Sequence, residues 1–137
     1  MPFKNGRVGM IDVRDIVDVA VKVLTSEGYE GQDYVLTGPQ AVSFNDVAGA
    51  LSVALGKTVQ YVDVPLEAGK RAMMDLGMSE WIADGYAELL DEFARDWGNR
   101  VSPDVEMITG RPGRTINQFA RDFAGVFGGA LALSGAH

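Results

Sequence analysis

The sequence contains no cysteine, and its only histidine is the last residue, His137. The absence of cysteine excludes disulfide bonds, thiolate catalysis and zinc sites built on cysteine. A single terminal histidine also excludes metal sites with two histidines and Ser-His-Asp triads. We therefore assign no catalytic residue and expect no metal site in this chain.

Basic charge and long hydrophobic runs are also scarce. Lys and Arg number 12 against 19 Asp and Glu, which gives a net charge of −7. This balance leaves no basic face for nucleic acid and no positive patch for an anionic membrane. No apolar run reaches the roughly 18 residues of a membrane span, and the start lacks a signal-peptide core. We expect a soluble, cytoplasmic protein that binds neither nucleic acid nor membrane.

The composition that remains is that of a globular protein. The chain has 137 residues, of which 47% are hydrophobic and 23% are charged. This length suits one domain. We expect a single domain over residues 1–127, followed by a flexible tail of small apolar residues over 128–137.

In the first half, short apolar stretches alternate with helical periodicity. Strands are expected at 8–11, 33–36 and 58–64, the last of them rich in Val and Tyr. Asp12 and Ser43 each precede an apolar pattern of helical spacing and are expected N-caps.

The second half is expected to be helical. A third helix should run from Pro65 to about Leu76. A fourth, with Ser79 as its N-cap, should run to about Trp97 and be followed by a loop. The apolar face of this fourth helix is expected to be formed by Ile82, Tyr86, Leu89, Leu90, Phe93 and Trp97. A fifth helix should begin after the N-cap Thr115. The predicted fold class is α/β of the α+β type, a small sheet of about three short strands with about five helices.

Two charged regions admit a structural and a functional interpretation. Asp12 and Asp15 could share an acid–base task, or they could cap a helix and favour its dipole. The segment 79–106 has eight acidic residues, which form either a solvated helix face or a docking surface for a basic partner.

The glycine-rich segments do not complete a phosphate cradle. The Gly6–Gly9 segment precedes a strand, whereas a dinucleotide fingerprint follows a strand and opens a helix. Arg111 and Arg114 precede the last helix and could bind an anion there, or the segment could be a structural loop.

An apolar aromatic cluster is the best candidate for a binding site. Met73, Met74 and Trp81 surround a helix-turn-helix, with Tyr86 one turn further on. Thioethers beside aromatic rings make an adaptable wall for a flat ligand, although core packing would use the same residues.

Several segments together resemble the C-terminal part of NmrA-like proteins, which are atypical short-chain dehydrogenase/reductase relatives. The matching segments, in the family's order over roughly residues 2–124, are GRVGMIDVRDI (6–16), YVLTGP (34–39), SFNDVA (43–48), LGK (55–57), YVDV (61–64) and TGRPGRT (109–115).

This resemblance implies relationship to NAD(P)-dependent reductases or redox-sensing regulators. A full NmrA-like chain begins with a Rossmann half that bears the glycine fingerprint, and the present sequence does not contain that half. We therefore expect the substrate-binding or lid half of such a reductase, with no cofactor in this chain and no activity in isolation. Its substrate pocket would include Met73, Met74, Trp81 and Tyr86.

Other partners and roles remain open. A non-enzymatic module that binds a small molecule or another protein is the alternative function. Expected partners are a second copy of the chain, a separate Rossmann-half protein and a small aromatic ligand. The homodimer is expected because the edges at 8–11 and 33–36, and the apolar face of the 13–24 helix, would otherwise lack a neighbour.

Overall fold

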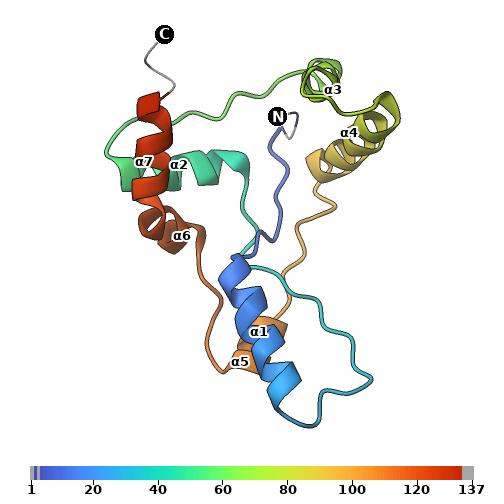
Figure 1. Ribbon diagram of the computed structural model, residues 1–137, viewed down its shortest axis with the longest axis vertical. Helices are drawn as coiled ribbons and strands as arrows, with labels where there is room; N and C mark the ends of the chain where they lie inside the picture. Colours follow the sequence, from blue (N-terminus) through green and yellow to red (C-terminus); the bar gives the residue numbers. More distant parts are fainter. Residues whose placement is uncertain (1, 3, 134–137) are drawn as a thin grey trace.

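The helices form three groups joined by extended segments (Figure 1). The computed structural model describes residues 2 and 4–133, and side chains as far as residue 128. The helices in this part are α1 (Val13–Thr25), α2 (Phe44–Leu55), α3 (Leu66–Asp75), α4 (Glu80–Ala94), α5 (Asp104–Thr109), α6 (Ile116–Asp122) and α7 (Ala124–Leu133). Contacts join α1 to α5, α3 to α4, and α2, α6 and α7 to one another.

A buried hydrophobic cluster lies between α1 and α5. Val19, Val105 and Ile108 are buried together. The partly buried residues packed against them are Ile11, Val23, Tyr29, Tyr34 and Leu36. Two of these, Tyr34 and Leu36, belong to the extended segment at 33–36. This segment contacts the core through alternate side chains while its backbone remains outside any sheet.

Local sequence signals fix the starts of α2 and α6. Ser43 accepts a hydrogen bond from the N–H of Asp46, whose carboxylate accepts one from the Ser43 N–H in return. Thr115 and Gln118 form the same reciprocal capping box at α6. Such boxes satisfy backbone donors that a helix start leaves free. Ser79 caps α4, and Asp12 caps α1 through the N–H of Arg14. The expected N-caps at these four positions are confirmed.

The predicted α/β fold class is wrong, because the described part of the chain is all-helical and contains no strand or sheet. The segments 8–11, 33–36 and 58–64 are extended, but a strand also requires a neighbouring strand to exchange backbone hydrogen bonds. An isolated antiparallel bridge between Val8 and Val42 is the pairing observed among the described residues. The N–H of Val35 instead donates to the carboxylate of Asp104, at 2.7 Å.

Helix boundaries in the second half also differ from the expectation. The fourth helix ends at Ala94, so Trp97 lies beyond it. The expected final helix is divided at Phe123 into α6 and α7, and α5 forms in a segment expected to be a loop. Residues 128–133 of the expected tail belong to α7, and 134–137 lie outside the described residues.

The arrangement is open for its size. The chain exposes 9045 Å², whereas a compact monomer of 14.7 kDa exposes about 6,900 Å². Part of the surplus is apolar, because Val13, Val17, Val21 and Leu24 are all more than half exposed on α1. These four residues recur at helical spacing, so we call them the α1 stripe. The α1 stripe is therefore an apolar helix face that another surface could cover.

Candidate functional site

A hollow lies along the outer face of α4. It has a volume of about 510 Å³ and is lined by Trp81, Ile82, Asp84, Gly85, Tyr86, Glu88 and Leu89. These residues define what we call the α4 groove. The volume is within the usual range for small-molecule sites, although this groove is open rather than enclosed.

The face of α4 that is buried carries mostly small residues, so its large apolar residues remain on the exposed face that bears the groove. Ala83, Ala87 and Leu90 are buried, while α4 packs against α3. The sequence had predicted a face formed by Ile82, Tyr86, Leu89, Leu90, Phe93 and Trp97. Of these, Leu90 is buried and Phe93 is half-buried, while the others are exposed. Exposed large apolar residues that lie together in this way are typical of a binding surface.

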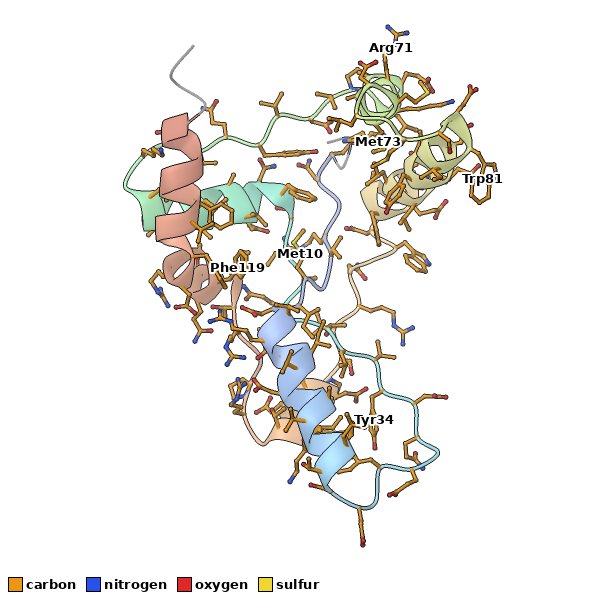
Figure 2. The ribbon with its side chains drawn as sticks, in the orientation of Figure 1. Met10, Tyr34, Arg71, Met73, Trp81 and Phe119 are labelled. Atoms are coloured by element: carbon orange, nitrogen blue, oxygen red, sulfur yellow. The ribbon has the colours of Figure 1, made fainter. Side chains whose placement is uncertain are left out.

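Two aromatic side chains form the groove's apolar wall. Trp81 is 84% exposed and Tyr86 is 49% exposed. Figure 2 shows Trp81 projecting from α4 into solvent. Exposed aromatic faces of this kind can stack on a flat ring.

Gly85 forms the floor of the groove between Trp81 and Leu89. These three residues are four positions apart and therefore share one face of the helix. A methyl group added to Gly85 would meet no other side chain within 4 Å. The glycine leaves the helix backbone accessible at this point, so a flat molecule can approach it closely.

Acidic side chains border the other side of the groove. Glu80, Asp84 and Glu88 follow one another at four-residue spacing. Lys70 of α3 forms ion pairs with Asp84 and, at 3.8 Å, with Glu80. The hydrogen bond to Asp84 raises the pKa of Lys70 above its usual value. Three carboxylates against one ammonium leave this border with a net negative charge.

The four predicted pocket residues divide between two positions. Trp81 and Tyr86 line the α4 groove together. Met73 and Met74 are half-buried on α3 and lie outside its lining. Sequence reasoning did not assign Gly85 and Leu89 to the pocket, although they lie four and eight residues after Trp81 and therefore share its helix face.

The charged cluster at the start of α1 has the geometry of a structural tie. Asp15 is fully buried, and its carboxylate accepts hydrogen bonds from the side chains of Arg111 and Arg114. It also accepts the backbone N–H of Arg114 at 2.6 Å. Asp18 pairs with the same two arginines. These contacts hold the 109–115 loop against α1.

The sequence left open whether Asp12 and Asp15 share an acid–base task and whether the arginines of the 109–115 loop bind an anion. The observed ion pairs bear on both questions. Asp12 caps α1 and accepts hydrogen bonds from Arg14, which hold the pKa of its carboxyl below the usual range. Arg111 and Arg114 are neutralised by carboxylates, so they do not offer an unpaired anion site. The geometry favours the helix-cap and structural-loop interpretations.

A smaller hollow of about 210 Å³ lies where the start of α1 meets α2 and α6. Met10, Phe44 and Phe119 form part of its apolar lining, and Asp12 and Arg114 lie at its edge. Met10 and Phe119 are labelled in Figure 2. Asp12 pairs with Arg14, and Arg114 pairs with Asp15 and Asp18, so this hollow presents mainly apolar surface.

Two further expectations concern metals and membranes. Within residues 2 and 4–133, no three His, Cys, Asp or Glu side chains lie close enough together to hold a metal ion. In the same part of the chain, no helix has the length and apolar character needed to cross a bilayer.

The sequence is similar to reductases over almost its full length. It is 47% identical over 130 residues to an NAD(P)H azoreductase of Xenophilus azovorans, covering 95% of this chain and 46% of the relative. No protein-family model matches the sequence.

Solved structures share the fold. The Citrobacter sp. triphenylmethane reductase complexed with NADP(H) matches with a TM-score of 0.73 and 26% identity, over 90% of this chain and 43% of that one. The NADPH-dependent quinone oxidoreductase QOR2 of Escherichia coli, complexed with NADPH, matches with a TM-score of 0.76. At 21% identity, over 89% of this chain and 43% of that one, the QOR2 match concerns the fold alone.

In each of these comparisons the chain spans less than half the length of its relative. The relatives are NmrA-like, atypical short-chain dehydrogenase/reductase proteins, as the sequence motifs had indicated. The chain is therefore homologous to part of an NmrA-like, atypical short-chain dehydrogenase/reductase protein.

Proposed function

We propose that this chain forms the substrate-side part of an NAD(P)H-dependent reductase that acts on flat aromatic acceptors. The observation that most supports this role is the 47% identity to an NAD(P)H azoreductase over 95% of the chain. The relatives of this chain include an azoreductase, a quinone oxidoreductase and a triphenylmethane reductase. Azo compounds, quinones and triphenylmethanes all present conjugated rings to a binding surface.

The α4 groove is the proposed contact surface for the acceptor. Trp81 and Tyr86 supply aromatic faces, while Ile82 and Leu89 supply aliphatic surface. Stacking and apolar burial there would hold a flat ring. Met73 and Met74 are half-buried on α3 outside the groove, so any effect of theirs on the acceptor would be indirect.

The described residues do not fit an NAD(P) site. No strand–glycine-loop–helix fingerprint is present in the sequence, and the arginines of the 109–115 loop already pair with Asp15 and Asp18. We propose that a Rossmann half supplies the cofactor site and covers part of the surplus surface. Hydride transfer is therefore a property proposed for the assembled reductase.

Binding titrations test this division of labour. In a Trp97→Phe background, a neutral quinone or azobenzene should quench the remaining tryptophan, Trp81. Calorimetric titration of the same chain with NADPH should give no heat of binding at micromolar concentrations. An unchanged Trp81 signal across a panel of flat aromatics, or micromolar affinity for NADPH, would contradict the proposal.

A further inference from the structure

The charge distribution around the α4 groove differs on its two sides. One side is apolar and aromatic, and the other bears Asp84 and Glu88. Glu80 lies one turn before Asp84, and Lys70 engages the Glu80–Asp84 end of the row. Arg71, also on α3, projects away from Trp81 in Figure 2. The Glu88 end of the groove is therefore the more negative one.

We propose that the α4 groove prefers planar aromatic ligands that bear a positive charge. This inference deepens the proposed function and rests on its assignment of the groove. A cationic ring would gain from the faces of Trp81 and Tyr86 and from the carboxylates on the opposite side. An anionic ring of the same shape would be repelled by the same carboxylates.

Gly85 sets the shape of this site. Glycine within a helix lowers helix stability relative to alanine, and the structure leaves room for a methyl group there. Replacement by alanine should therefore stabilise α4 while it raises the floor of the groove. A ligand lying against the backbone at Gly85 would lose contact.

A matched pair of probes isolates the effect of charge. The probes are azobenzene with a para-trimethylammonium group and azobenzene with a para-sulfonate group. Binding is followed by quenching of Trp81 in the Trp97→Phe protein. We expect the cation to bind about tenfold more tightly at low salt, and the preference to shrink as salt rises.

Two substitutions with matched controls locate the effect. Glu88→Gln should reduce the preference for the cation severalfold, whereas Glu106→Gln, the same change on α5, should not. Gly85→Ala should weaken binding of both probes, whereas Gly49→Ala on α2, where a methyl group is equally unobstructed, should not. Both alanine variants should raise the midpoint of thermal unfolding, which shows that the chain remains folded.

The outcomes separate this inference from the proposed function. Equal affinity for the two probes would overturn the charge preference while leaving the groove as an aromatic site. Quenching by neither probe, or a Gly85→Ala protein that binds normally, would overturn the placement of the ligand. Binding that disappears as protein concentration rises would show a second copy covering the groove, and would also overturn the inference.

Discussion

At the scale of single residues, Asp15 is a fully buried carboxylate that connects two segments distant in the sequence. It ties α1 to the 109–115 loop through Arg111 and Arg114. A buried charge that has lost its partner is costly, whereas an exposed ion pair contributes little. For the stability of the fold, the burial of Asp15 therefore matters more than the number of arginines that it contacts.

Asp15→Asn should lower the free energy of unfolding by about 2–3 kcal/mol, because it removes the buried charge that pairs with Arg111 and Arg114. The loss is limited because both arginines are partly exposed to solvent. Asp18 contacts the same arginines but is 40% exposed. Asp18→Asn should therefore cost less than about 1 kcal/mol. Urea unfolding of both variants measures the difference, and equal losses would contradict the tie through Asp15.

Asp12 should make stability depend on pH in the acid range. Hydrogen bonds from Arg14 hold its pKa below the usual value, so the stabilisation is present above about pH 4 and is lost as pH falls through the lower folded pKa. Asp12→Asn should cost about 1 kcal/mol at neutral pH, because asparagine still caps a helix but does not form the ion pair.

The difference between the wild type and Asp12→Asn should close between about pH 4 and pH 2. Urea titrations across this range measure it. Asp33→Asn is the control, since Asp33 is exposed. A gap that stays constant down to pH 2 would show that the carboxylate of Asp12 contributes no charge-dependent stability.

At the scale of helices, local signals in the sequence located the starts of α1, α2, α4 and α6 but not the buried faces. Asp12, Ser43, Ser79 and Thr115 were found from the residues around them, because capping depends on neighbours within one turn. The buried face of α4 depends on its packing against α3, which the pattern of residues within α4 does not reveal. Apolar periodicity therefore selected Trp97 and overlooked Ala83.

The three extended segments illustrate the same limit. Their residue types favour strands, but a β-strand also needs a partner strand, and that partner can lie at any distance along the chain. Among the described residues, no such partner is present beyond the Val8–Val42 bridge. For the candidate site, residue type identified Trp81 and Tyr86. The part of Gly85 in the groove was found only from the structure, which leaves open space beside it.

The α1 stripe gives a prediction at this scale. Val17 is 54% exposed, so Val17→Lys should change the free energy of unfolding by less than about 0.5 kcal/mol. It should nevertheless reduce binding of a hydrophobic dye and weaken self-association, because a charge would interrupt the stripe. Val53→Lys, at an exposed position on α2, should do neither. Equal effects of the two substitutions would argue against a contact surface on α1.

At the scale of the whole molecule, the surplus of surface is the dominant feature. It amounts to about 2,100 Å², whereas one side of a standard protein interface buries about 800 Å². An open chain of this kind should associate with another surface when one is present. We therefore predict a homodimer for the chain alone, measured by sedimentation equilibrium at micromolar concentration; a monomer of 14.7 kDa throughout would contradict it.

We propose that this chain is the substrate side of an NAD(P)H-dependent reductase. A chimera tests it most directly, with this chain replacing the matching 46% of the Xenophilus azovorans azoreductase. We expect a folded chimera that oxidises NADPH only when an azo compound is present, and that loses this activity on Trp81→Ala. A folded chimera that binds NADPH normally but reduces no azo compound or quinone would contradict the proposed function.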